Sequence, residues 1–260
     1  MSSSSNPPGP SDSSQLSSTN TPPLDSNINP TASLTYWDSV PATTNAMLAM
    51  LGNYPWYTRI DLRGSRTFLS KIRRLVPGCP VDGKLQRGVD CGAGVGRVTE
   101  GFLRHVCSTV DAVEPVSKFT DVIQAKKDKT ASTGEGWGGS IGEIYVTGIE
   151  GWRPEIEYDL IWTQFCVGHV TDVQLVEYLV RCREALCESG ILVLKENIST
   201  DFEGKDMYDD EDSSVTRTDE KFRKLFREAG LAVIASELQL GFPKNFRLLP
   251  VRFYALRPKT

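Results

Sequence analysis

Residues 88–97, which read GVDCGAGVGR, carry the clearest chemical signal in the sequence. The residues before the glycines predict a buried strand, the glycines predict a tight turn, and the residues after them predict a helix. A helix that begins at such a turn directs its free N–H groups toward the turn, where polar groups of a ligand can bind. The stretch therefore predicts a ligand-binding turn between a strand and a helix.

The spacing of the glycines selects among nucleotide ligands. Gly92, Gly94 and Gly96 follow the pattern G-x-G-x-G, and Arg97 stands where a dinucleotide fingerprint requires its third glycine. No Gly-Lys-Ser/Thr follows, which argues against a Walker phosphate loop. Glu114 lies about 20 residues further on, at the predicted end of the next strand, where a carboxylate can accept both ribose hydroxyls. The pattern favours a nucleoside without a pyrophosphate, and a tight turn without any ligand is the simpler alternative.

Strands alternate with helices after this turn, which predicts an α/β fold with a mostly parallel sheet and helices on both faces. No helix is predicted between the strands at residues 231–237 and 251–256, so this last pair is expected to be antiparallel. Before the sheet, apolar residues at helical spacing predict a helix over residues 38–51 and another over residues 61–75. Residues 52–60 between them, which are rich in aromatic side chains, are expected to form a loop.

Composition limits the remaining function classes. Residues 1–30 are mostly Ser, Pro, Asn and Thr and predict a disordered tail. The net charge of −4 gives no general attraction to nucleic acid or to an anionic membrane, and no run of 18 apolar residues predicts a membrane span. The six cysteines form no CxxC pair, which favours buried reduced thiols over disulfides or a metal site. Without an apolar signal region, a cytoplasmic protein is expected, and the nucleus stays open.

Five separate segments resemble the protein N-terminal α-amine methyltransferases, which are class I S-adenosyl-L-methionine-dependent methyltransferases. The segments are Tyr36-Trp37, the glycine turn, WTQFCVGHVTD at residues 162–172, Lys195-Glu196-Asn197 and DDEDSSV at residues 209–215. Members of this family methylate the free α-amino group of proteins that begin X-Pro-Lys or X-Pro-Arg after removal of Met. The resemblance covers residues 34–257.

The resemblance implies a single Rossmann-like seven-stranded domain at residues 85–260, with an antiparallel last strand, after an N-terminal helical extension at residues 31–84. It implies S-adenosyl-L-methionine as cofactor and the N-terminal segments of X-Pro-Lys/Arg proteins as partners. We expect a monomer, with no metal and with neither nucleic acid nor membrane as a partner.

The resemblance also assigns residues to the cofactor. Arg97 would pair with the carboxylate of the cofactor, because a guanidinium matches that shape, and Glu114, where the family usually has Asp, would bind the ribose. The alternative for Arg97 is a solvated helix residue, and it is the less favoured interpretation. The complete cofactor-binding assignment is Gly92, Gly94, Arg97, Glu114, Gly148, Ile149, Glu150 and Gln164.

A second set of residues is assigned to the substrate. Asp212, His169 and Asn197 would be catalytic, with Asp212 facing the α-amine. A lone loop histidine is often structural, and an acidic run is usually a solvated loop, so both roles depend on the resemblance. The substrate-binding assignment is Trp37, Phe165, Asp209 and Ser214. Phe165 stands where the family has Trp, which predicts a wider pocket.

Two other functions stay open on the sequence alone. One is a methyltransferase for a small amine or metabolite, and the other is a cofactor-binding regulatory module without catalysis. A nicotinamide oxidoreductase is disfavoured by Arg97 and by the early third glycine.

Overall fold

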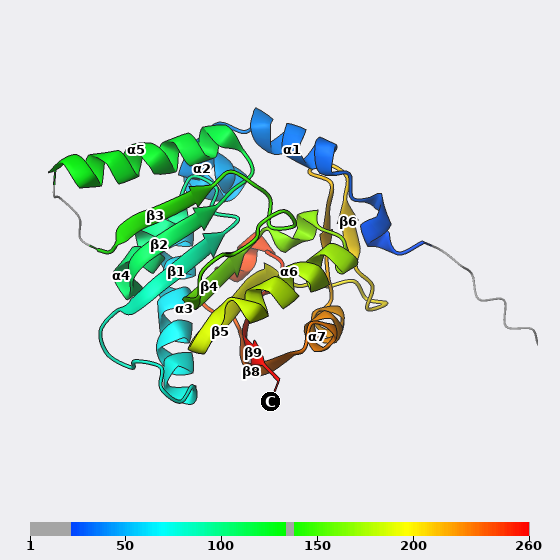
Figure 1. Ribbon diagram of the computed structural model, residues 1–260. Helices are drawn as coiled ribbons and strands as arrows, with labels where there is room; N and C mark the ends of the chain where they lie inside the picture. The colour runs from blue at the N-terminus through cyan, green and yellow to red at the C-terminus, as the bar shows by residue number, and fades with distance from the viewer. Residues whose placement is uncertain (1–21, 134–137, 260) are drawn as a thin grey trace, which may run out of the picture.

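The protein was analysed as a computed structural model that describes residues 22–133 and 138–259. A seven-stranded sheet with the strand order β3-β2-β1-β4-β5-β9-β8 forms its body (Figure 1). This sheet confirms the predicted fold class. The strands are β1 Leu85–Cys91, β2 Cys107–Val113, β3 Ser140–Tyr145, β4 Tyr158–Gln164, β5 Leu186–Asn197, β8 Leu231–Leu238 and β9 Val251–Pro258.

The direction of the strands determines where a ligand can bind. The pairs β1–β2, β1–β4, β2–β3 and β4–β5 are parallel, whereas β9 is antiparallel to both β5 and β8. The chain runs from β1 outward to β3 and then returns to β4, so the strand order reverses between β1 and β4. In open α/β sheets the crevice beyond the carboxyl ends of the strands at such a reversal is the usual ligand site.

Helices cover both faces of the sheet, because alternate strand residues point to opposite sides. Ile161 and Leu192 pack with α6 Asp172–Glu184 and α7 Asp219–Glu228 in one core cluster. The neighbouring residues Leu160 and Val193 pack with α3 Pro55–Ile72 and with the helical turns after β1 in another. These turns are a π-helical segment, η4 Thr99–Leu103, and α4 Arg104–Val106. Helix α5 Ser117–Thr133 follows β2.

The N-terminal extension differs in detail from the sequence prediction. The expected single helix over residues 38–51 is wrong. Instead the chain forms α1 Pro30–Ser39, α2 Thr44–Met47 and η2 Ala49–Asn53. Helix α1 ends just before Pro41, because proline disfavours helical geometry in the residue that precedes it. Helix α3 begins at Pro55, inside the predicted aromatic loop, because proline is favoured in the first turn of a helix. The short turn η3 Arg73–Leu75 follows it.

Residues 1–21 of the predicted tail lie outside the described residues. The rest of that predicted tail is structured, since it contains η1 Leu24–Asn27. The Asp25 carboxylate accepts a hydrogen bond from the backbone N–H of Asp172 at 2.8 Å, and the Asn29 N–H donates to Ser213 Oγ at 2.8 Å. Folded structure therefore begins earlier than composition indicates, because these polar groups have partners that are distant in sequence.

The acidic loop after β5 contains a short hairpin of β6 Met207–Asp209 and β7 Ser214–Thr216. Two further short turns, η5 Val167–His169 and η6 Lys244–Phe246, follow β4 and β8. All six cysteines are unpaired, as predicted. None of the helices in the described ranges has both the length and the apolar character that a membrane crossing requires. The described residues contain no group of three or more His, Cys, Asp or Glu side chains arranged to hold a metal ion.

Candidate active site

A cavity opens beyond the carboxyl ends of β1 and β4. All eight residues that the sequence assigns to the cofactor line it, together with Trp37, Phe165 and His169. Asp212, Asn197, Asp209 and Ser214 do not line it. Helix α1 contributes Ser33 and Leu34 to the wall, and neither residue was singled out in the sequence. The cavity therefore lies between the strand ends and the N-terminal extension.

The glycine turn forms one end of the cavity with backbone that only glycine adopts readily. Gly92 and Gly94 have φ values of +74° and +54°. A Cβ atom on Gly92 would lie 2.4 Å from the Cβ of Cys166, and one on Gly94 would lie 2.8 Å from the terminal methyl of Met47. The Gly92 N–H donates to the Val113 carbonyl at 2.9 Å, which ties the turn to the end of β2. Backbone conformation favours glycine at both positions, and at Gly92 the contact with Cys166 also leaves no room for a side chain.

Glu114 holds this turn in place. Its Oε2 accepts a hydrogen bond from the Gly94 N–H at 2.8 Å, and its Oε1 accepts one from the Val116 N–H at 2.9 Å. Burial raises the pKa of Glu114, and the two backbone donors oppose that shift. Because a carboxylate has about four acceptor positions, both oxygens keep capacity for a ligand hydroxyl. Glu114 can thus brace the turn and bind a ribose at the same time.

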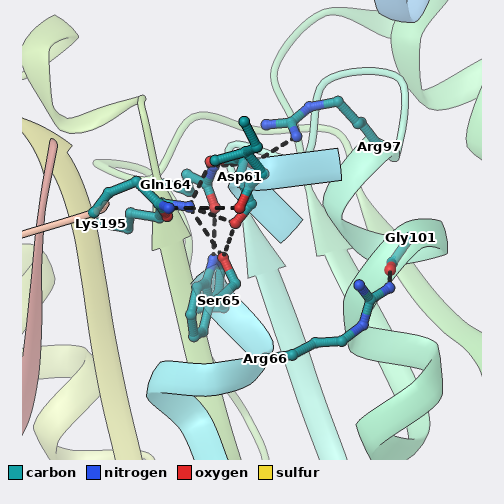
Figure 2. Close-up of polar contacts among 10 residues, drawn as sticks. Asp61, Ser65, Arg66, Arg97, Gly101, Gln164 and Lys195 are labelled. Atoms are coloured by element: carbon teal, nitrogen blue, oxygen red, sulfur yellow. Dashed lines mark hydrogen bonds and ion pairs between the residues drawn. The ribbon is translucent and has the colours of Figure 1, made fainter. Parts of the chain in front are cut away.

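Arg97, after the glycine turn that follows β1, and Gln164, at the end of β4, share one unpredicted partner, Asp61 (Figure 2). Arg97 Nη1 lies 2.6 Å from Asp61 Oδ2, and Gln164 Nε2 donates to the same carboxylate at 3.1 Å. The Gln164 amide is oriented by Trp162, whose indole N–H donates to Gln164 Oε1 at 3.0 Å. The orientation of both predicted cofactor residues therefore depends on an aspartate in α3.

His169 is held by two residues of α1. Its Nε2 accepts a hydrogen bond from the Trp37 indole N–H at 3.2 Å, and its Nδ1 lies 2.9 Å from Ser33 Oγ. Because an indole only donates, Nε2 carries the lone pair, and the neutral ring carries its hydrogen on Nδ1. Burial lowers the pKa of His169 and outweighs the opposing effect of Asp212. The neutral imidazole is therefore favoured at neutral pH.

Asp212 lies next to His169, with Oδ2 at 3.9 Å from Nε2. Its Oδ1 is buried and has no hydrogen-bond partner among the described residues. A buried acceptor without a partner is uncommon in folded proteins and indicates a role that needs it. The adjacent Ser213 has a φ of +55°, and its hydroxyl bonds Asn29 and Tyr208. These contacts orient the loop that carries Asp212.

Arg217 joins this loop to the turn that carries His169, and the sequence analysis missed it. The side chain is fully buried, and it donates to the carbonyls of Val167 at 2.7 Å and Val170 at 2.6 Å. Its Nε pairs with Asp172 at 2.8 Å. These bonds lie on both sides of His169, so Arg217 positions the turn without touching the ring. No sequence signal distinguishes it from any other basic residue near a helix start.

Three of the remaining predicted residues, Asp209, Ser214 and Asn197, do not line the cavity. Asp209 and Ser214 face each other across the β6–β7 hairpin, and Asn197 ends β5. Tyr36, beside Trp37, has its pKa raised by burial and by three nearby carboxylates, which places its phenol near the acidic loop. Phe165 lines the cavity with a φ of +56°, an unusual conformation for a bulky residue that is characteristic of functional sites.

Comparison with known proteins adds a family. Residues 25–257 match the profile of a family described as AdoMet dependent proline di-methyltransferase. An alpha N-terminal protein methyltransferase 1 from Schizosaccharomyces pombe is 41% identical, over 86% of this chain and 94% of its own length. An N-terminal Xaa-Pro-Lys N-methyltransferase 1-A from Xenopus laevis is 37% identical, over 80% of this chain and 87% of its own.

Solved structures agree with the fold. A SAM-dependent methyltransferase from Leishmania major matches with a TM-score of 0.73 and 30% identity, covering 91% of this chain and 87% of that chain. The N-methyltransferase NodS from Bradyrhizobium japonicum in complex with S-adenosyl-L-homocysteine matches with a TM-score of 0.61 and 14% identity. That match covers 89% of this chain and all of NodS, and it supports the fold alone.

Proposed function

Because the chain belongs to the S-adenosyl-L-methionine-dependent proline di-methyltransferase family, we propose that it methylates the free α-amino group of proteins that begin X-Pro-Lys or X-Pro-Arg after removal of Met. The observation that carries the proposal is the position of Asp212 next to His169, with a buried carboxylate oxygen beside the cofactor cavity that has no hydrogen-bond partner in the described part of the chain. Such an oxygen can accept a proton from an amine.

The residues around the glycine turn fit S-adenosyl-L-methionine. A Cβ atom at Gly92 would collide with Cys166 and one at Gly94 would displace the terminal methyl of Met47, so the turn presents backbone to a ligand at both positions. Glu114 supplies acceptors for the ribose, and Arg97 supplies a cation for the carboxylate of the amino-acid half. When bound, the cofactor supplies an electrophilic methyl group to the substrate nitrogen.

The amine must arrive neutral and be held in line with that methyl group. An α-amino group has a pKa of about 8, so an appreciable fraction is neutral near pH 7 and no strong base is needed. His169 Nε2 already accepts from Trp37, which leaves Asp212 Oδ1 as the acceptor with free capacity. In this proposal Asp212 accepts the amine proton, and the neutral His169 ring beside it helps to position the substrate. Positioning supplies much of the rate enhancement.

Recognition of the following residues involves aromatic and acidic groups. The rings of Trp37 and Phe165 form walls on which a proline at position two can pack. Asp209 and Ser214 on the β6–β7 hairpin would receive a basic side chain at position three, and Asn197 would bond the substrate backbone or amine. Charge complementarity of this kind favours the correct partner over neutral or acidic sequences.

The test is a methyl-transfer assay with S-adenosyl-L-methionine and X-Pro-Lys peptides, in which products are identified by mass. We expect methylation of the free peptide and none of the same peptide with an acetylated N-terminus. An X-Ala-Lys peptide and a panel of small amines are the specificity controls. Equal labelling of the acetylated peptide, or turnover of small amines alone, would contradict the proposal. The mass also counts the methyl groups transferred.

A further inference from the structure

Asp61 lies in α3, outside the sheet, and contacts side chains that come from the carboxyl-end side of three strands (Figure 2). It is fully buried, and its carboxylate accepts from Arg97 after β1, Gln164 at the end of β4 and Lys195 near the end of β5. Burying these charged groups costs desolvation free energy, and their mutual attraction offsets that cost only when the geometry of the contacts is good.

Lys195 cannot itself contact a ligand. Its side chain is fully buried, does not line the cavity and lies over the Phe253 ring at 4.6 Å from Nζ to the centroid. Its Nζ donates to Asp61 Oδ1, to the Asp61 carbonyl at 3.0 Å and to Ser65 Oγ at 3.1 Å. Asp61 and Ser65 are one helical turn apart, so the ammonium fixes this face of α3 against β5.

Arg97 contacts both Asp61 and the cavity. Its Nη1 lies 2.6 Å from Asp61 Oδ2, whereas its Nε and Nη2 have no hydrogen-bond partner within the described part of the chain. The guanidinium is planar and rigid, so a bond at one corner limits the directions of the others. The side chain is 11% exposed, and it lines the cavity. One side of the group is thus anchored and another remains available.

We propose that Asp61 is a positioning residue for S-adenosyl-L-methionine, which holds Arg97 in the orientation that binds the carboxylate of the cofactor's amino-acid half. The inference deepens the proposed function and rests on its assignment of Arg97. A flexible arginine loses rotamer freedom when it binds an anion. Asp61 restricts that freedom before the cofactor arrives, which is the general route by which preorganisation raises affinity.

The charges in the cluster support the same role. The flanking cations Lys195 and Arg97 hold the pKa of Asp61 below its usual range, so its carboxylate is ionised at neutral pH. The charge of Arg97 also lowers the pKa of Asp90, but burial dominates and raises that pKa to about 6. Asp90 accepts its hydrogen bond from the Thr99 hydroxyl at 2.6 Å and not from Arg97. Two cations therefore share one directly bonded carboxylate, which leaves Arg97 able to attract a further anion.

Docking of α3 does not by itself explain Asp61, because other residues hold the helix. Leu62 packs directly over the Cα of Gly101, where a Cβ atom would lie 2.4 Å from the Leu62 Cδ1 atom. Arg66 donates to the Gly101 carbonyl, as Figure 2 shows beside the Asp61 cluster. These contacts join α3 to the π-helical turn η4 without involving the cavity, and they provide a matched control.

The test compares two ligands by isothermal titration calorimetry. S-adenosylhomocysteine has the carboxylate, whereas 5′-methylthioadenosine shares the nucleoside and sulfur but lacks it. For Asp61→Asn we expect S-adenosylhomocysteine affinity to fall at least about tenfold, with 5′-methylthioadenosine affinity unchanged. Arg97→Ala should show the same selective loss, and combining both changes should add little. The control Arg66→Met should bind both ligands as the unmodified protein does.

Asp61→Asn leaves Lys195 buried without its partner and can prevent folding, so Asp61→Asn/Lys195→Met is the second variant. This variant removes the carboxylate partner of Arg97 without leaving an unpaired buried ammonium. We expect the same selective loss of S-adenosylhomocysteine affinity. Unchanged affinity, or equal loss for both ligands, would overturn the role of Asp61. If Arg97→Ala lacks the selective loss, the assignment of Arg97 fails as well. If Asp61→Asn shows the selective loss in a protein that does not methylate X-Pro-Lys peptides, the proposed substrate fails while this inference stands.

Discussion

The cofactor end and the amine end of the cavity are built in different ways. At the cofactor end, Glu114 bonds backbone N–H groups that are 20 and 2 residues away in sequence. At the amine end, His169 bonds Ser33 and Trp37 across 136 and 132 residues. Backbone groups of a strand–turn–helix unit thus shape the glycine turn at the first end, although Asp61 reaches Arg97 and Gln164 there from a distant segment. At the second end, the contacts that hold His169 come from distant side chains. Single side-chain changes should therefore affect either cofactor binding or peptide methylation without affecting both.

The side chains at the two ends of the cavity also differ in solvent exposure. At the cofactor end the side chain of Arg97 is 11% exposed, whereas the side chains of His169 and Asp212 are 20% and 23% exposed. Groups at the amine end are therefore more open to solvent, ions and exchange of partners. This difference predicts that pH and salt act mainly on substrate turnover and peptide binding, and little on cofactor binding.

The largest separation is expected for Asp212→Asn. An amide cannot accept the amine proton, so kcat should fall by about a hundredfold or more. The Kd of S-adenosylhomocysteine should not change, because Asp212 does not line the cofactor cavity. Steady-state kinetics with an X-Pro-Lys peptide and calorimetry with S-adenosylhomocysteine measure the two quantities. An unchanged kcat would remove Asp212 from the mechanism.

This contrast also explains how much the sequence could predict. The strand, glycine turn and helix are local, and their spacing alone predicted a turn that lines the cavity, with Glu114 beside it after the next strand. The residues at the amine end were found only through family resemblance, since Trp37 and Asp212 have no local pattern of their own. Asp61 and Arg217 escaped both routes, because a buried charge is indistinguishable from a surface charge until its tertiary partners are known.

The cofactor end can be broken separately by Glu114→Gln. Both carboxylate oxygens accept backbone N–H groups, so a carboxamide must direct its NH2 group against a donor. We expect the Kd of S-adenosylhomocysteine to rise by about tenfold, since a buried N–H loses its acceptor. The peptide KM, measured at saturating cofactor, should change little. Loss of peptide binding equal to the loss of cofactor binding would show that the two ends are not independent.

The hydrogen bond between Trp37 and His169 can be tested through its effect on pH dependence. The indole N–H donates to the Nε2 lone pair and so stabilises the neutral ring. In Trp37→Phe this donor is absent, the pKa of His169 rises, and the acidic limb of the kcat profile moves to higher pH. We expect a loss of about threefold to tenfold in kcat/KM near pH 7. An acidic limb that does not move would exclude His169 as the group that titrates there.

The smallest expected effect is the response to salt, and it compares the two ends in one unmodified protein. The acidic residues of the hairpin are solvent-accessible, and the Debye length falls from about 14 Å at 50 mM salt to about 6 Å at 300 mM. The KM of an X-Pro-Lys peptide should therefore rise a few-fold, and that of an X-Pro-Ala peptide should stay nearly constant. Arg97 pairs with a fully buried carboxylate, so the Kd of S-adenosylhomocysteine should change much less. Equal salt dependence for cofactor and peptide would mean that the Arg97 site is as open to ions as the hairpin, contrary to the burial of Asp61.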